Sequence, residues 1–272
     1  MLEYSPALAR HRAIQCGWAW TFGLATLAGA LFVMVRYQSV LATYFDWPIL
    51  LKLNHYAFRS ALLNKAISGI SSLPLLTGIL SAGLFWYLWF GFFSEDARAR
   101  LLLGLAAAAI AVILSRGMQL ALPTHLRPLH SPEYGFQPLP GIDPSVLSGW
   151  NSFPSDHACL YFALVAVIWL QSWRVGLFAL IPALLGSLPR IYLGIHYPTD
   201  VVFGALLGIY VVVLFDKYGP ATLAHRVIDL ESKRASMFYF CGFLLTYEIG
   251  TLFTDIRAVA RGLALAWGLS SF

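Results

Sequence analysis

The sequence predicts an all-α fold, a polytopic membrane helix bundle with a six-transmembrane-helix core and an additional C-terminal apolar segment. The composition indicates this first: 59% of the 272 residues are hydrophobic and 11% are charged, whereas soluble domains carry about 25% charged residues. Mean hydropathy is +0.70. Long apolar runs and the basic residues beside them complete the pattern. We expect a single membrane domain over residues 1–272, in which residues 100–216 form the catalytic core.

Seven apolar runs are long enough to be membrane-spanning helices. They cover residues 14–36, 70–93, 99–121, 155–172, 174–193, 199–216 and 235–254. The first is too long for a signal-peptide core, which predicts an uncleaved span. Residues 38–68 contain Asp46, Lys52, His55 and Arg59, which fit poorly in lipid, so an interfacial or re-entrant helix is expected there.

Basic residues predict the orientation of the bundle. Six core spans place them at one end, and the positive-inside rule makes that end cytoplasmic. They are Arg10, Arg12, Arg98, Arg100, Arg174, Lys217, Arg226, Lys233 and Arg234. The loop 122–154 and the turn 190–199 then lie on the opposite face. We expect the tail 255–272 to lie along the interface as an amphipathic helix.

Charge and cysteine content argue against nucleic-acid binding and against a cysteine-based metal site. The net charge of +5 is explained by membrane orientation, so nucleic-acid binding is not expected. Cys16, Cys159 and Cys241 lie in apolar surroundings without CxxC spacing and are interpreted as small hydrophobic residues. No cluster with metal-ligand spacing is present in the sequence, so neither a metal nor a cofactor is predicted.

Three polar clusters fall at the non-cytoplasmic ends of the predicted spans. The first contains Arg116, Gln119, His125, Arg127 and Pro128, the second Ser155 and His157, and the third Arg190, His196 and Asp200. A single arginine there is often a snorkelling anchor, and a single histidine is often an interfacial residue. Three clusters on one face instead indicate a functional site, because ionisable groups at a membrane are costly.

The second cluster has the properties of an anion site. A helix that starts near Pro154 directs its free N–H groups outward, Ser155 adds a hydroxyl donor, and His157 follows. The alternative is an ordinary helix cap with a proline at the start of the helix.

The third cluster favours phosphate chemistry. His196 and Asp200 are four residues apart, so on a helix the carboxylate can accept a hydrogen bond from one imidazole nitrogen and leave the other free. Arg190 can donate two parallel hydrogen bonds to phosphate oxygens. The residues predict a phosphate site with two histidines, one of them oriented by a carboxylate.

These motifs resemble those of the type-2 phosphatidic acid phosphatase superfamily, which carries K-x6-R-P, P-S-G-H and S-R-x5-H-x3-D. The chain has Arg127-Pro128, "PSDH" from Pro154 to His157, and "PRIYLGIHYPTD" with Arg190, His196 and Asp200 at the same spacings. The resemblance covers about residues 100–216, and it implies a metal-independent lipid phosphatase.

The resemblance also implies roles for individual residues. His196 is expected to form a phosphohistidine, Asp200 to orient it, and His157 to protonate the leaving group. The expected phosphate-binding groups are Arg127, Arg190, Ser155 and the backbone amides of Ser155 and Asp156. Water would then release phosphate from His196.

The chain departs from the motifs at three positions. Leu120 replaces the first-motif lysine, so Arg116 or Gln119 is the candidate substitute, unless Arg116 only anchors its span. Pro189 replaces the serine before the third-motif arginine. Asp156 replaces glycine, which favours the helix N-terminus but repels a bound dianion.

"PSDH" and "GIHYPTD" are similar to the undecaprenyl pyrophosphate phosphatase branch of the superfamily. The leading hypothesis is hydrolysis of undecaprenyl pyrophosphate or a related polyprenyl phosphate at the periplasmic face of a bacterial inner membrane. A phosphatidic acid or phosphatidylglycerol phosphate phosphatase and a lipid phosphotransferase are alternatives of the same fold. A lipid-phosphate binder or transporter is the non-enzyme alternative, although binding alone needs no oriented nucleophile. The expected partners are the lipid phosphate and membrane lipids, and the oligomeric state is left open.

Overall fold

The structure, a computed structural model, describes residues 21–263 apart from 22, 72–73, 92–93, 140–141, 144, 146, 255, 257 and 260–261. Within these residues the chain is helical and contains no β-strand, as predicted. Arg10, Arg12, Cys16 and most of the predicted tail helix lie outside the described residues.

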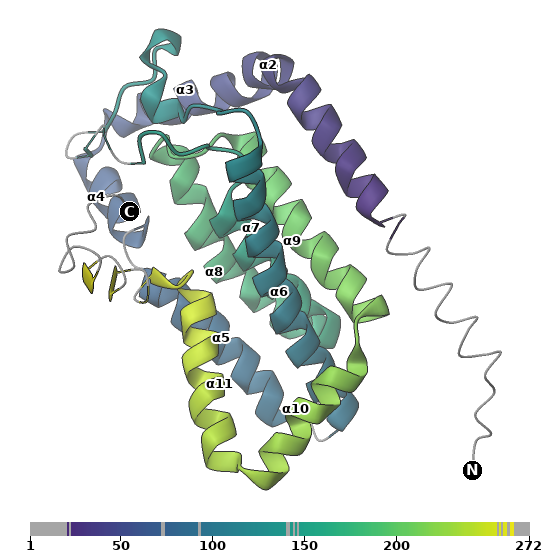
Figure 1. Cartoon of the computed structure of the whole chain (residues 1–272). Helices are drawn as coiled ribbons and strands as arrows, with labels where there is room; N and C mark the ends of the chain where they lie inside the picture. The colour runs from purple at the N-terminus through teal and green to yellow at the C-terminus, as the bar shows by residue number, and fades with distance from the viewer. Residues whose placement is uncertain are drawn as a thin grey trace.

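The bundle is built around one central helix (Figure 1). Its helices are α5 (Pro74–Gly91), α6 (Glu95–Ala121), α7 (Asp156–Gln171), α8 (Trp173–Tyr192), α9 (Pro198–Tyr218) and α11 (Ala235–Gly250). α7 packs against α6, α8 and α9, and its residues 158–168 are buried apart from the half-buried Phe162. The uniformly apolar sequence of α7 therefore reflects burial among other helices.

Among the described helices, α6, α8 and α9 are long and apolar enough to cross a membrane. A fourth span is obtained if the helix Gly23–Arg36 and the segment Gln38–Ala57, which are bent by 64° to each other, are counted together. The shorter α7 is also apolar. The chain is therefore an integral membrane protein, while the count of six core spans stays a prediction.

The polar stretch after the first helix lies across one end of the bundle (Figure 1). It comprises α2 (Gln38–Leu41), the π-helical turn η1 (Ala42–Asp46), α3 (Trp47–Ala57) and α4 (Ala61–Ser71). Asp46 accepts hydrogen bonds from Thr199 N and Oγ1, at 2.9 and 2.7 Å. Asn54 exchanges two hydrogen bonds with the backbone of Gln137, at 2.7 and 3.0 Å. These contacts tie the stretch to the start of α9 and to the long loop.

Serine residues cap the helices at both ends of the bundle. The side chains of Ser94, Ser155 and Ser172 accept hydrogen bonds from the backbone at the starts of α6, α7 and α8. At the end opposite the long loop, Arg98 pairs with Glu231 of α10 (Ala221–Lys233) at 3.3 Å, and Arg100 pairs with Asp216 at 2.7 Å. Part of the basic end predicted from the sequence is therefore engaged in ion pairs between helices.

Two glycines of α9 allow it to approach the backbone of α7. A Cβ atom at Gly204 would lie 2.4 Å from the carbonyl oxygen of Ser155, and one at Gly208 would lie 2.1 Å from that of Cys159. Glycines four residues apart allow such close helix contacts in membranes. This contact sets the distance between the start of α7 and the start of α9.

Gly208→Val is expected to destabilise the protein by about 2–3 kcal/mol, because the added atoms force α7 and α9 apart. Thermal unfolding of the detergent-purified protein measures the effect. Gly83→Val is the control, since a Cβ atom at Gly83 in α5 meets no atom within 4 Å. Equal midpoints for the two variants would contradict the close contact.

Candidate active site

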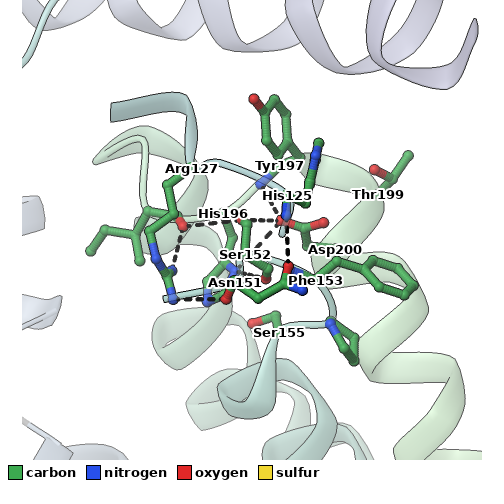
Figure 2. A network of polar contacts seen from close by, with 12 residues as sticks. His125, Arg127, Asn151, Ser152, Phe153, Ser155, His196, Tyr197, Thr199 and Asp200 are labelled. Carbon is green, nitrogen blue, oxygen red and sulfur yellow. Dashed lines mark hydrogen bonds and ion pairs between the residues drawn. The ribbon is translucent and has the colours of Figure 1, made fainter. Parts of the chain in front are cut away.

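The three polar clusters predicted from the sequence meet at one end of the bundle, where α6 and α8 end and α7 and α9 begin. Ser155 N donates to the carbonyl oxygen of Asp200 at 3.1 Å, and Ser152 N donates to that of His125 at 2.9 Å. Arg127 reaches the carbonyl oxygen of Ile195 at 2.6 Å. Figure 2 shows the side chains of the long loop and of the α8–α9 turn directed toward one another.

His196 is buried, and a backbone carbonyl fixes its ring. Its Nδ1 atom lies 2.8 Å from the carbonyl oxygen of Ser152 and 3.6 Å from Asp200 Oδ2. Because a carbonyl only accepts hydrogen bonds, Nδ1 carries the proton and Nε2 keeps its lone pair. Asp200 was expected to orient this ring; its carboxylate lies within ion-pair distance of Nδ1, while the carbonyl oxygen of Ser152 is the nearer acceptor. His196 precedes α9, and Ser152 is its hydrogen-bond acceptor.

Ser152 is a site residue that sequence reasoning missed. Its hydroxyl donates to Asp200 Oδ2 at 2.5 Å, and the backbone N–H of Tyr197 donates to the same oxygen at 2.9 Å. Ser152 is completely buried and links Asp200 to His196 through its side chain and its carbonyl group. The available signal was the polar pair Asn151-Ser152, which is separated from the second motif only by Phe153.

His157 lies between an anion and a cation. Its Nδ1 atom is 3.0 Å from Asp156 Oδ1, and its Nε2 atom is 2.8 Å from Arg190 Nη2. A guanidinium only donates hydrogen bonds, so Nε2 is the acceptor and the proton is on Nδ1. The backbone amide of Asp156 was predicted to bind phosphate and that role stays a prediction, while the carboxylate of Asp156 accepts a hydrogen bond from His157.

Arg127 is buried and is bonded to backbone carbonyl groups. Its Nη1 donates to Ile195 at 2.6 Å and its Nη2 to Asn151 at 3.2 Å. Burial lowers the pKa of Arg127 to about 10, and Asp156 and Asp200 oppose this shift, so the guanidinium stays charged at neutral pH. The Nε atoms of Arg127 and Arg190 have no hydrogen-bond partner among the described residues.

The structure corrects the predicted anion site at Ser155. α7 begins at Asp156, and Ser155 is its N-cap, with Oγ accepting from Ala158 N at 3.4 Å. The backbone N–H of Ser155 donates to Asp200, so it is not a free donor for phosphate. The prediction that this amide binds phosphate was wrong, because spacing along the chain does not show which carbonyl a loop amide will meet.

Arg116, the candidate substitute for the missing lysine, lies beside the loop. Its Nη1 donates to Gln119 Oε1 at 2.5 Å, and its guanidinium carbon lies 4.0 Å from the ring centroid of Trp150. Gln119 in turn donates to the carbonyl oxygen of Pro154 at 2.7 Å. Leu120 is 72% exposed, so the residue at the lysine position faces away from these groups.

A partly apolar recess adjoins Asp200. It is lined by residues from the first helix, α2, the long loop and the start of α9, among them Met34, Leu41, His125, Phe153 and Asp200. Burial lowers the pKa of His125. Among the residues that the structure describes, no group of three or more His, Cys, Asp or Glu side chains has the arrangement of a metal site.

The part of the chain that contains His157 and His196 matches a known family model. Residues 123–221 match the family model of the PAP2 superfamily. The match covers the long loop, α7, α8 and α9. The matched segment contains Arg127, His157, Arg190, His196 and Asp200, whereas Arg116 and Gln119 of the first cluster lie before it.

Three curated proteins are similar to parts of this chain. The bacitracin transport permease protein BcrC of Bacillus licheniformis is 35% identical over 39% of this chain and 53% of its own length. The lipid A 1-diphosphate synthase of Escherichia coli is 28% identical over 62% of this chain and 70% of its own length. The undecaprenyl-diphosphatase of Sulfolobus acidocaldarius is 32% identical over 39% of this chain and 48% of its own length. The matches thus span about half the length of the first and the third relative.

Proposed function

We propose that the chain is a metal-independent lipid phosphatase that hydrolyses undecaprenyl pyrophosphate or a related polyprenyl phosphate through a phosphohistidine. One observation carries the proposal: in both histidines an acceptor binds Nδ1. The acceptor is the carbonyl oxygen of Ser152 for His196 and the carboxylate of Asp156 for His157. In each ring Nε2 is therefore the reactive nitrogen. A pair of such rings, with Arg190 bonded to one of them and Arg127 bonded to the residue before the other, suits phosphoryl transfer better than binding alone.

In the first step, His196 Nε2 attacks phosphorus and forms a P–N bond, while the bond from phosphorus to the leaving oxygen breaks. His157, protonated on both nitrogens for this step, gives its Nε2 proton to that oxygen. A protonated Nε2 no longer accepts from Arg190, so the guanidinium can turn its donors to the phosphoryl oxygens. Arg127 supplies a second cation, through donors that the backbone carbonyls leave unused.

In the second step, water attacks phosphorus and the P–N bond to His196 breaks. His157, which lost its Nε2 proton in the first step, takes a proton from the water. Phosphate leaves, and the protonated His157 is ready for the next substrate. The same two histidines therefore serve both halves of the reaction.

The lipid substrate is proposed from the relatives and from the "PSDH" motif. The name undecaprenyl-diphosphatase belongs to the archaeal relative, and we extend its substrate class to this chain. The apolar lining beside Asp200 suits a lipid ligand. We place the protein in a bacterial inner membrane with the site on the periplasmic face, because the paired basic residues lie at the opposite end of the bundle.

A lipid phosphotransferase is the second candidate, favoured by the likeness to a diphosphate synthase over 62% of the chain. In that reaction a second lipid phosphate replaces water in the second step. The two histidines would keep their roles, and the protein would bind a second lipid as the acceptor of the phosphoryl group.

The test is phosphate release by the purified protein, with chelator and without added metal, from undecaprenyl pyrophosphate, undecaprenyl phosphate and phosphatidic acid. Release that is fastest from the pyrophosphate supports the proposal. Transfer of phosphate to added lipid A without free phosphate would identify the phosphotransferase. Loss of activity with chelator would overturn the metal-independent mechanism, and tight binding without turnover would support the non-enzyme alternative.

A further inference from the structure

Asp156 stands at the first position of α7, where the resembled motif has glycine. Its Oδ1 atom accepts two hydrogen bonds from the next residue, one from the backbone N–H of His157 at 2.9 Å and one from the ring at 3.0 Å. Both side chains are 19% exposed. A carboxylate in the first turn also interacts favourably with the helix dipole. The double contact with one histidine is a feature that a capping role alone does not require.

The two contacts fix the orientation of the His157 ring. Asp156 can only accept hydrogen bonds and Arg190 Nη2 can only donate, so they bind opposite nitrogens of the imidazole. If the carboxylate were absent, the described contacts of the ring would leave Nδ1 without an acceptor. The ring could then rotate, or carry its proton on the other nitrogen.

The charges of Asp156, His157 and Arg190 also indicate that the carboxylate supports the ring of His157. A general acid must carry its extra proton before it gives it up, and a protonated His157 beside Arg190 places two cations in contact. The carboxylate of Asp156 touches the ring and offsets this repulsion.

We propose that Asp156 is the positioning residue of His157, holding the proton on Nδ1 so that Nε2 faces the leaving-group oxygen. The inference rests on the proposed function, because it assigns a role within that reaction. This role also explains why an acid is tolerated beside a phosphate site, because the negative charge of Asp156 is directed at the imidazole of His157. Asp156 itself does not touch the substrate.

The dependence of the rate on the leaving group tests this role. An alkyl phosphate needs a proton on its leaving oxygen, whereas p-nitrophenyl phosphate has a leaving group that is stable as an anion. The quantity to compare is kcat/KM, which covers the steps up to release of the leaving group. The probes are phosphatidic acid and p-nitrophenyl phosphate, with Asp156→Ala, Asp156→Asn and wild-type protein.

Asp156→Ala is expected to lower kcat/KM for phosphatidic acid about 10- to 100-fold and to change that for p-nitrophenyl phosphate less than about threefold. Asp156→Asn keeps an oxygen that can accept from Nδ1 but loses the charge, so an intermediate loss is expected. Asp143→Asn is the control, because Asp143 is an exposed carboxylate of the long loop that accepts from Ser145 N. Retained turnover of p-nitrophenyl phosphate demonstrates that the variants are folded.

Equal losses with both esters would assign Asp156 a structural role and overturn the inference, as would unchanged activity with both. Wild-type protein that releases phosphate from neither ester, and also not from undecaprenyl pyrophosphate or undecaprenyl phosphate, would instead overturn the proposed function. The two failures are therefore distinguishable in one experiment.

Discussion

His196→Gln is expected to lower phosphate release from undecaprenyl pyrophosphate at least about a thousandfold, because it removes the nitrogen that attacks phosphorus. Glutamine is similar in size and retains a side-chain donor that can reach the carbonyl oxygen of Ser152, so the loop should keep its position. Initial rates of phosphate release at saturating substrate measure the loss.

His55→Gln is the matched control. His55 lies on an exposed face of α3, with its ring packed edge-on against Tyr56, and its loss should leave the rate within about twofold. A His196 variant that retains a tenth or more of the wild-type rate would exclude this residue as the nucleophile.

Asp200→Asn is expected to lower kcat by about 100- to 10000-fold, the second largest effect. The carboxylate positions Ser152 through its hydroxyl group, and Ser152 in turn binds the proton on His196 Nδ1. Its negative charge, 3.6 Å from that nitrogen, also stabilises the positive ring that forms as Nε2 bonds to phosphorus.

Ser152→Ala separates these two contributions. It removes the hydroxyl bond and keeps the carbonyl group and the charge, so a loss of only about tenfold is expected. Unfolding midpoints of both variants show whether the losses arise from instability. If Ser152→Ala is as severe as Asp200→Asn, the charge of Asp200 makes no contribution of its own.

The sequence predicted the helical class and most helix positions, because apolar runs are local signals. It also placed Arg127, His157, Arg190 and His196 in one site, and the structure brings them together. Their catalytic roles stay predictions. The separation of the stretch 38–68 from the spans stays a prediction, because residues 38–57 can also be counted with Gly23–Arg36 as one bent span.

The hydrogen bonds within the site could not be predicted from spacing. The interpretation of His196 and Asp200 assumed one continuous helix, but α9 begins at Pro198 and leaves His196 in the preceding turn. The N–H of Ser155 and the guanidinium of Arg127 both bind carbonyl groups from distant segments. Backbone carbonyl groups are present at every residue, so no residue pattern indicates which of them a folded loop will present.

The phosphoenzyme itself tests the central claim most directly. Wild-type protein and His157→Gln are mixed with substrate carrying radiolabelled phosphate and quenched in alkali, and the labelled peptides are then mapped. The account predicts a label that is stable in base, labile in acid and attached to His196, with His157→Gln retaining it longer because no base activates water. A label on any other residue, or phosphate release without a labelled protein under these conditions, would contradict the phosphohistidine mechanism.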